Sequence, residues 1–543
     1  MKAYLITPLL LAASASAPTE VPGTAAPVGV GASADRAVDF VRGGINVFDH
    51  LSADQRRDVG ACTRSRDVAG GIEAAVAAAL ANGSGRVVLP GGCYRISRPI
   101  TLPSNVELAG AAMRATRIMP AGNFPAILAE GTYARGLTGV GVQNLTVVCA
   151  GMGNANAMGV RLVYVNRGKL RDLYFNGCRH GLDLYDQWQT TIDNVTVDGV
   201  GAEQNQVGVY MGPPTDPANK APNNAVILSN STMQNVALYG YQLVFFAGSK
   251  FMNDEAMNGK TGWKLCGEAY QISQQACQFG HFYNIVADTT DGPGIVVDQA
   301  ENANPVNNVM FANVWIGTSA LHALYLAGVT YSQFDDVHIT SADNGVYLHN
   351  SNNVKVSANV AQYNRGNNGS HAAVIDGGAD NTLWATNNRS DHPTGYNGIR
   401  ESGPTSGNAI WGGAAACAPE LTLGGKATHG SAQTTRSCQY EVQGRQVRMT
   451  FRLALSGPGL AAGNALLQNL PFAAGAGASP DGTASALLAN GMKGIGGAII
   501  ARTVPGSAGA QLFYQGTQRM MPLTRDNFTA SSIISGTIEY SRK

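Results

Sequence analysis

Residues 313–337 read NVWIGTSALHALYLAGVTYSQFDDV, a stretch that begins and ends with an Asn or Asp followed by an apolar residue. Such pairs open short apolar segments throughout the middle of the chain: Asn144-Leu145, Asp172-Leu173, Asn194-Val195, Asn235-Val236, Asn284-Ile285, Asn313-Val314, Asp336-Val337 and Asn359-Val360. Their apolar members are 28, 22, 41, 49, 29, 23 and 23 residues apart, so each long gap corresponds to about two units. A unit of roughly 22 to 29 residues is one coil of a parallel β-helix with three sheets.

Stacking explains why such a unit repeats. A single coil cannot bury its inward face, whereas stacked coils about 4.8 Å apart share one continuous apolar core. The repeats therefore predict an all-β right-handed parallel β-helix over residues 111–411. The Asn and Asp residues at each repeated bend are expected to cap turns.

The regions on either side of the repeats differ from them. Residues 67–80 carry apolar side chains at helical spacing, which predicts one helix capping the open end of the β-helix within a module spanning residues 44–110. Residues 412–438 are rich in Gly, Ala, Thr and Ser and are interpreted as a linker. Alternating apolar residues return in residues 439–543, which predicts a small antiparallel β-domain resembling a sandwich.

Charge and cysteine content exclude some functions and leave others open. The formal net charge is +1, so nucleic acid is not an expected partner. The eight cysteines fit no zinc pattern, and we expect neither a metal nor a cofactor. Most cysteines are expected to be small buried residues, although Cys266 and Cys277, and Cys417 and Cys438, could pair in an oxidising compartment.

The N-terminal segment, residues 1–43, has two interpretations. Met1-Lys2, the apolar run that follows and Ala13-Ser14-Ala15 are typical of a secretory leader, but the Pro- and Ala-rich continuation also fits an arm that attaches the protein to a virion. No segment approaches the ~20 apolar residues of a membrane span, so membrane insertion is not expected.

A family resemblance lies in residues 44–97, which contain NVFD, an Ala-rich helical segment and VVLPGGCYRI. Together with LPSNVELAGAAMRATRI, this stretch resembles the N-terminal module of pectate-lyase-like β-helix proteins in the version found in bacteriophage tailspikes. The C-terminal segments GRQVRMTFRLALSG and ISGTIEYS resemble a small terminal module of phage tail proteins. The resemblance implies a homotrimer on a virion tail, with glycan hydrolase or lyase sites on the coils and a terminal module for trimer assembly or glycan contact.

One related family is disfavoured. Polygalacturonases share the β-helix but need a paired-aspartate segment, a GHG and an RIK on successive coils, and the chain has none of these. The fold does not determine the reaction, so the site has to be argued from its residues.

Cleaving a glycosidic bond usually needs two carboxyl groups, one acting as acid and the other as base or nucleophile. Aligning the predicted strands places Asp198, Glu255 and Asp288 on one outward sheet face beside Tyr239 and Trp315. We predict that the three acids are catalytic. The residues predicted to bind the sugar are Asp183, Asp186, Trp188, Tyr239, Trp263 and Trp315. A solvated outward Asp, or a Trp packed under a loop, is the alternative for each.

These features predict a phage tailspike, located on the virion tail, that binds and depolymerises a host surface polysaccharide such as lipopolysaccharide O-antigen or capsule. Its other expected partners are phage tail or baseplate proteins bound through the N-terminal arm. Two alternatives remain open: an adhesin that binds without cleaving, and a secreted bacterial polysaccharide lyase or hydrolase.

Overall fold

The computed structural model describes residues 44–542 apart from 217–222, 267–276, 299–305, 362–370, 388–398, 407, 425, 428–432, 458–460, 476–484, 496–498 and 517–518. The predicted leader or virion arm, residues 1–43, lies outside the described residues. Among the described helices, none is long and apolar enough to span a membrane.

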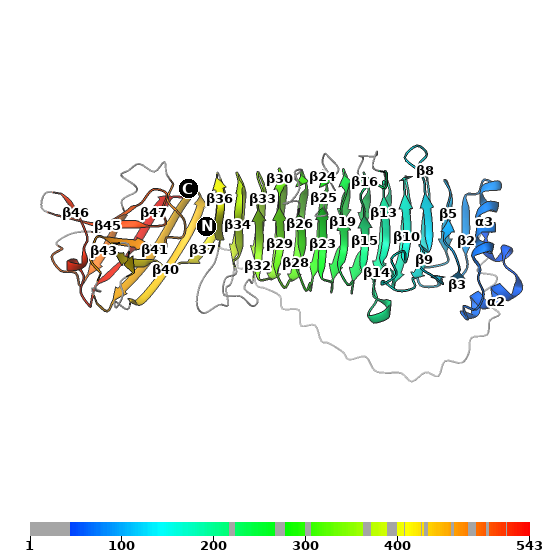
Figure 1. The fold of residues 1–543 in the computed structure, drawn as a ribbon, viewed down its shortest axis with the longest axis horizontal. Coiled ribbons are helices and arrows are strands. Elements are labelled where there is room, and N and C mark those ends of the chain that lie inside the picture. The colour runs from blue at the N-terminus through cyan, green and yellow to red at the C-terminus, as the bar shows by residue number, and fades with distance from the viewer. Residues whose placement is uncertain are drawn as a thin grey trace, which may run out of the picture. The chain divides into compact units, whose positions relative to one another are not determined.

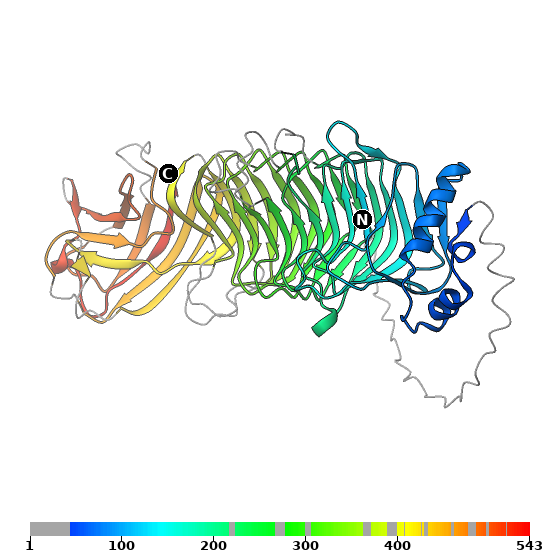
Figure 2. The ribbon, with the colours of Figure 1, turned by 45° about the vertical axis from the view of Figure 1, so that its right-hand side comes forward.

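The middle of the chain is a right-handed parallel β-helix, as predicted, and its coils stack side by side in Figures 1 and 2. Sheet A contains β1 (Ile45–Asn46), β2 (Arg86–Leu89), β3 (Gly92–Ile96), β5 (Glu107–Gly110), β6 (Thr116–Pro120), β9 (Gly141–Val148), β12 (Lys169–Asn176), β14 (Thr191–Val197), β17 (Ile227–Ser229), β18 (Thr232–Gln234), β21 (Lys250–Met252), β22 (Glu255–Met257), β25 (His281–Asp288), β28 (Met310–Thr318), β31 (Gln333–Ser341), β33 (Lys355–Val360), β35 (Thr382–Asn387) and β37 (Ala409–Ala416). Strands on neighbouring coils pair in parallel.

Two further sheets complete each coil. Sheet B contains β4 (Ile100–Thr101), β7 (Ile127–Glu130), β10 (Met158–Val163), β13 (His180–Tyr185), β15 (Val207–Met211), β19 (Tyr239–Leu243), β23 (Thr261–Cys266), β26 (Ile295–Asp298), β29 (His322–Ala327), β32 (Asn344–His349), β34 (Ala373–Ala379) and β36 (Ile399–Ser406). Sheet C consists of short strands: β8 (Leu137–Thr138), β11 (Val165–Asn166), β16 (Asn223–Asn224), β20 (Phe246–Ala247), β24 (Cys277–Gln278), β27 (Val306–Asn307) and β30 (Val329–Thr330).

The predicted Asn and Asp bends are present, with one correction to the register. The bend residues have positive φ, for example 51° at Asn194 and 54° at Asn313, a conformation that Asn and Asp tolerate. Asn230 and Asn253 continue this row between Asn194 and Asn284. Three coil steps therefore separate β14 from β25, instead of the four inferred from the sequence. The error arose because Asn235 precedes an apolar residue but belongs to a second bend.

Aromatic rings fill the core in a continuous stack. Phe251 and Phe282 lie 4.5 Å apart between ring centroids, Phe282 and Phe311 lie 4.2 Å apart, and Phe334 continues the stack at 5.0 Å. All four rings are buried. Because parallel strands repeat in register, identical side chains at the same position of successive coils pack face to face.

Glycines stand at the start of most sheet B strands, where the chain turns closely over the core. A Cβ added at Gly208 would lie 2.4 Å from the carbonyl oxygen of Gly240, and one added at Gly240 would lie 2.6 Å from Ala256. Gly159, Gly181, Gly262, Gly294 and Gly345 are similarly confined. Side chains larger than that of alanine, which stands at this position in Ala323 and Ala372, do not fit there.

The N-terminal end of the β-helix is covered by helices. The predicted helix is α3 (Ala69–Ala81), which buries Ile72 and Val76 and contacts β1 and β2. The structure adds α2 (Ala53–Ala61), preceded by the 3-10 helix η1 (Val47–His50). A capping box between Ser52 and Gln55 begins α2, and this motif was visible in the sequence.

The C-terminal module is an antiparallel structure made of β38 (Glu420–Leu423), β39 (Lys426–Ala427), β40 (Gln433–Gly444), β41 (Gln446–Leu455), β42 (Ala465–Gln468), β43 (Ser485–Asn490), β44 (Ile499–Thr503), β45 (Ala510–Gln515), β46 (Met520–Pro522) and β47 (Ile533–Ser541). The linker predicted at 412–438 is wrong, because β37, β38, β39 and β40 extend into it. β37 pairs in parallel with β35 and antiparallel with β40, so its backbone continues the coils into the module. Small residues suggested a linker, yet strand pairing uses only the backbone.

The cysteines form four disulfides: Cys62–Cys93, Cys149–Cys178, Cys266–Cys277 and Cys417–Cys438. The two pairs foreseen from the sequence are present. The expectation that the other four cysteines are merely small buried residues is wrong. Cys149 and Cys178 follow the paired strands β9 and β12 of neighbouring coils, so the stacking brings them together. Cys62 ends α2, which contacts β3, the strand that holds Cys93.

Asp254 is a fully buried carboxyl group at a core-facing bend between β21 and β22. Burial raises its pKa to about 8, against the lowering effect of hydrogen bonds from the backbone N–H groups of Ser231 and Met252. The folded protein therefore holds the proton more tightly than the unfolded chain does. This contribution to stability is present below the unfolded pKa of 3.8 and is lost as the pH rises through about 8.

We therefore expect the free energy of unfolding to fall by about 1.4 kcal/mol per pH unit between those two pKa values, on account of this one group. Urea denaturation at pH 5, 6, 7 and 8 would measure the slope in the wild type and in Asp254→Asn. The variant should lose that part of the slope. If the free energy of unfolding changed with pH by the same amount in both proteins, the raised pKa would not belong to Asp254.

Candidate functional site

The outward face of sheet B carries a row of polar and aromatic side chains. Asp183 lies on β13 between Leu182 and Leu184, which both enter the core, so it points away from the core as predicted. The strand register places one residue of each neighbouring coil beside it. The row runs Arg161, Asp183, Tyr210, Gln242, Lys264, Val296, Tyr325 and Tyr347.

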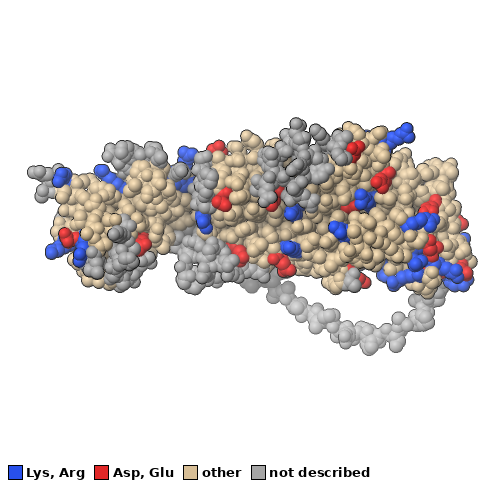
Figure 3. Space-filling view, in the orientation of Figure 1, with Lys and Arg blue, Asp and Glu red and all other residues tan. Residues whose placement is uncertain are grey.

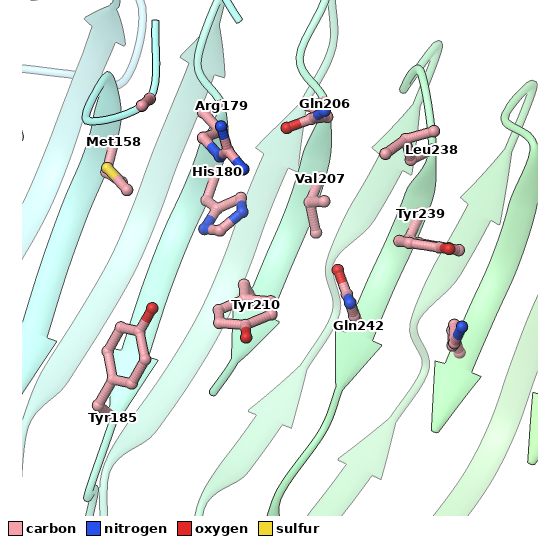
Figure 4. A pocket seen from close by; sticks show the side chains of 12 residues that line it. Met158, Arg179, His180, Tyr185, Gln206, Val207, Tyr210, Leu238, Tyr239 and Gln242 are labelled. Carbon is pink, nitrogen blue, oxygen red and sulfur yellow. The ribbon is translucent and has the colours of Figure 1, made fainter. Parts of the chain in front are cut away.

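A cavity of about 560 Å³ opens over this face, on strands β10 to β23. Figure 4 shows the side chains of β13, β15 and β19 that surround it. Its lining includes His180, Tyr185, Tyr210 and Tyr239, together with the cationic side chains Arg179 and Lys264. Among the described residues, the lining contains no carboxylate, and its two cations favour an anionic ligand. We call this cavity the sheet B groove.

His180 and Asp183 form a buried pair at the wall of the groove. His180 Nδ1 lies 2.6 Å from Asp183 Oδ1, and Asp183 itself is fully buried. Because an ionised carboxylate only accepts hydrogen bonds, this contact places a proton on Nδ1. In the neutral imidazole Nε2 is then the nitrogen that can act as a base. Arg161 Nη1 lies 3.4 Å from Asp183 Oδ2 and balances the buried charge.

Two tyrosines stand next to this pair. The ring of Tyr210 stacks on His180 with 4.6 Å between centroids, and the edge of Tyr185 meets Tyr210 at 5.8 Å. Burial raises the pKa of Tyr185, and the negative charge of Asp183 raises it further. The Tyr185 hydroxyl therefore stays protonated and acts as a hydrogen-bond donor.

The far side of the groove combines an aromatic ring with a cation. Lys264 Nζ lies 5.4 Å from the ring centroid of Tyr239. A base, a hydrogen-bond donor and cations that bind a negative charge thus line one cavity, and this set suits removal of a proton next to a carboxylate.

On sheet A the structure places Glu255 and Asp288 on the adjacent strands β22 and β25. Glu255 is opposite Val286, so the two acids are offset by two residues and their Cα atoms lie about 8 Å apart, given strand spacings of about 4.8 Å and rises of about 3.3 Å per residue. Burial raises the pKa of Glu255, and the charge of Asp288 adds to the effect. Asp288 Oδ1 accepts the backbone N–H groups of Thr289 and Thr318.

Trp315 lies in the same row as Glu255, two strands further along, and is 43% exposed. Its indole N–H donates to Thr340 Oγ1 at 3.0 Å. An acid of raised pKa, a second carboxylate and an exposed ring therefore share this sheet A face, as expected from the sequence.

Asp198 is not brought to this pair. It follows β14, and β18 and β22 lie between β14 and β25, so Asp198 is about 14 Å from Asp288 along the stack. Hydrogen bonds from Asn235 and Gln234 lower the pKa of Asp198, although burial opposes them. The group is a hydrogen-bonded carboxylate at a bend.

The sheet A alignment was also wrong for Tyr239. Thr232 and Gln234 of β18 occupy the coil position assigned to Tyr239, which instead begins the sheet B strand β19. The misreading follows from the extra bend at Asn235. Tyr239 nevertheless lines the sheet B groove.

The tryptophan and aspartate predictions have mixed outcomes. Trp263 is fully buried and stacks on Tyr241 at 3.7 Å, so its predicted contact with sugar is wrong. Trp188 is 48% exposed, but its backbone bridges to sheet C, away from the groove. Asp186 accepts hydrogen bonds from Thr215, and Asp183 is fully buried and contacts His180.

A sequence signal for the sheet B face was present and overlooked. A Gly followed by apolar, variable and apolar residues recurs as GVRL (159–162), GLDL (181–184), GVYM (208–211), GYQL (240–243), GWKL (262–265), GIVV (294–297) and GVYL (345–348). The side chain at the variable position points outward and belongs to the row described above. His180, Tyr185, Tyr210 and Arg161 could have been found by aligning these motifs.

No group of His, Cys, Asp and Glu among the described residues has the arrangement of a metal site. Figure 3 shows acidic and basic side chains interspersed on the visible face, without a broad field of one sign.

Comparison with known proteins gave matches among solved structures alone: no family model matches the chain, and no curated protein does. The A-module of an Azotobacter vinelandii mannuronan C-5 epimerase is 18% identical over 68% of this chain and 93% of its own, with a TM-score of 0.45. The Dettilon tailspike protein is 12% identical over 87% and 91%, with a TM-score of 0.39. DFA-IIIase from Arthrobacter chlorophenolicus is 10% identical over 62% and 93%, with a TM-score of 0.46. The similar structures include a phage tailspike, and the chain is itself a right-handed parallel β-helix protein.

Proposed function

We propose that this protein is an extracellular polysaccharide depolymerase that binds an acidic glycan in the sheet B groove and cleaves it there. The observation that carries the proposal is the buried Asp183–His180 pair at a cavity whose described lining combines tyrosines with two cations and holds no carboxylate. A glycan bearing uronic acids matches this lining in charge, and the tyrosine rings offer flat apolar surfaces to its sugar rings.

The chemistry that fits these groups is β-elimination. His180 Nε2 takes the proton from the carbon next to the sugar carboxylate, whose charge is stabilised by Lys264 and Arg179. The electron pair left behind forms a carbon–carbon double bond, and the glycosidic carbon–oxygen bond breaks. The leaving oxygen takes the proton that His180 Nε2 has accepted, so His180 returns to its starting state. Asp183 keeps His180 in the tautomer that this step needs.

The biological setting that we propose first is a phage virion tail, where the protein would act on host lipopolysaccharide O-antigen or capsule. This setting is supported by the N-terminal module in residues 44–97, and it implies a homotrimer with tail proteins as partners. A secreted bacterial enzyme is the second candidate. It is favoured by the four disulfides, because such bonds persist outside the reducing cytoplasm.

The test is incubation with a panel of purified capsular and O-antigen polysaccharides, acidic and neutral. Elimination produces new chain ends together with ultraviolet absorbance from the double bond conjugated to the carboxylate. New reducing ends without that absorbance would indicate hydrolysis instead. Binding without new ends would leave an adhesin, and neither binding nor cleavage would overturn the proposal. Peptide mapping of the N-terminus from purified virions or culture medium separates the two settings.

Hydrolysis at Glu255 and Asp288 is the second candidate reaction, favoured by two acids on adjacent strands with Cα atoms about 8 Å apart; inverting glycosidases hold their two carboxyl groups about 6.5 to 9.5 Å apart. If these acids cleave the glycan, Glu255→Gln should lower the hydrolysis rate by about 10²-fold or more, because glutamine cannot protonate the leaving oxygen. The raised pKa of Glu255 should keep activity at a pH above the usual range of glutamate.

Reducing-end assays from pH 4 to 8 on wild type, Glu255→Gln and His180→Ala would measure this. If only Glu255→Gln loses cleavage activity, cleavage is assigned to sheet A. If only His180→Ala loses that activity, the acid pair is excluded as the catalytic centre.

A further inference from the structure

A second cluster of rings lies on the outward face of sheet B, beyond the groove. His322 and Tyr325 lie 5.5 Å apart between centroids with planes 15° apart, and Tyr325 and Tyr347 lie 5.6 Å apart with planes 28° apart. His322 and Tyr347 are 4.5 Å apart. All three side chains are half-buried. We call these three residues the aromatic platform.

Polar neighbours hold the platform in place. Tyr347 donates its hydroxyl proton to Asp376 Oδ2 at 3.2 Å, and His349 Nδ1 lies 3.2 Å from the same oxygen. Asn344 Nδ2 lies 3.2 Å from His322 Nδ1. Rings fixed by hydrogen bonds lose little conformational entropy when a ligand stacks on them, which suits a binding surface.

The platform continues the row that passes through the groove. Lys264 pairs in register with Val296, Val296 with Tyr325, and Tyr325 with Tyr347. Tyr325 therefore lies two strands beyond Lys264, or about 10 Å along the stack. Only the half-buried Val296 separates them in the row, so both lie on one face of the same sheet. A glycan following this face passes from one to the other.

Charge distinguishes the platform from the groove. The described groove lining has Arg179 and Lys264 and no carboxylate, whereas the platform tyrosines lie near two carboxylates, Asp298 and Asp376, and one cation, Arg400. Burial, followed by these carboxylates, raises the pKa of Tyr325 and of Tyr347, so both hydroxyls stay neutral. Negative charges nearby disfavour a uronate, while neutral rings with hydroxyls suit an uncharged sugar.

We propose that the aromatic platform is a second saccharide-binding site for uncharged sugar units of the same glycan chain, so that the preferred substrate is a heteropolysaccharide with both acidic and neutral units running along the stack. This inference rests on the proposed function of the groove. It adds the direction of the chain and the composition of its repeat.

A purely structural role for the rings is the competing explanation. The core already has its own stack, in which Phe251, Phe282 and Phe311 are fully buried. The platform rings instead point outward and fill no core space, and their edges carry hydrogen-bonding groups. Glycan stacking accounts for both features.

The test uses fragments of hyaluronan, which alternates acidic and neutral sugars, and fragments of polygalacturonate, which is acidic throughout. Affinities of tetrasaccharides and decasaccharides would be measured by calorimetry on the full chain, with His180→Ala present to prevent turnover. We expect hyaluronan decasaccharide to bind about tenfold more tightly than its tetrasaccharide. Tyr325→Ala combined with Tyr347→Ala should remove that gain and leave tetrasaccharide affinity unchanged.

Tyr283→Ala is the matched control, because Tyr283 is 56% exposed on sheet A and its loss should change neither affinity. A gain with length that persists in the platform double variant, or the absence of any gain, would overturn the platform while leaving the groove proposal intact. If the platform double variant lost as much affinity for polygalacturonate decasaccharide as for hyaluronan decasaccharide, the proposed preference for neutral units would be overturned. Failure of every acidic fragment to bind would instead overturn the proposed function.

Discussion

His180→Ala is expected to lower the rate of polysaccharide cleavage by about 10²- to 10⁴-fold, the usual contribution of a positioned general base. Alanine removes the nitrogen that takes the proton, while Arg179, Lys264 and the tyrosine rings of the groove remain. Substrate binding should therefore change little, and the loss should appear in kcat. Steady-state kinetics on the cleaved polysaccharide, followed by absorbance of the unsaturated product, would measure both constants.

Asp183→Asn provides the companion variant. Asparagine can offer an amide N–H to His180 Nδ1, which would favour the wrong tautomer and again lower kcat with KM nearly unchanged. Because Asp183 is fully buried beside Arg161, the melting temperature must be recorded to separate lost activity from lost folding. A stable His180→Ala protein with wild-type kcat would remove the catalytic assignment of the groove.

Phe282→Ala is expected to destabilise the protein by about 3–5 kcal/mol, the usual cost of truncating a buried Phe. The ring stacks on Phe251 at 4.5 Å and on Phe311 at 4.2 Å, so its removal leaves a gap between two coils. Loss of this contact interrupts the core in the middle of the stack. Urea denaturation of wild type and variant would give the difference in unfolding free energy.

The next residue along β25 is the internal control. Tyr283 points outward and is 56% exposed, so Tyr283→Ala should change the stability by no more than about 0.5 kcal/mol. Similar destabilisation by both substitutions would mean that side chains do not alternate between core and solvent on this strand, contrary to the register described above.

Much of the fold was predictable because it repeats. Bend residues such as Asn194 and Asn313 mark each coil, and they do so for a local reason, their tolerance of positive φ. The register failed where Asn235 resembled a bend of the main row, since a local pattern does not say which of two bends it belongs to. The strand β37 was missed because it pairs with β40 through backbone hydrogen bonds, and amino-acid composition does not reveal such pairing.

The site was predicted less well than the fold. The acids Glu255 and Asp288 do lie on adjacent strands, since both follow bends of the same row. The sheet B groove was overlooked because its strands were never aligned on their glycines. His180 is the first residue of β13, at a corner of the coil where side chains no longer alternate simply between core and solvent. Its pairing with Asp183 therefore could not be predicted from alternation.

The strand register fixes the distance between Lys264 and Tyr325 as a whole number of coils. Each coil adds about 4.8 Å, so inserting or deleting a whole coil between the groove and the platform would lengthen or shorten the distance between the two sites by that amount. Related chains could adapt to glycans with longer or shorter repeats by changing the number of coils between the two sites, while the residues of both sites stay the same.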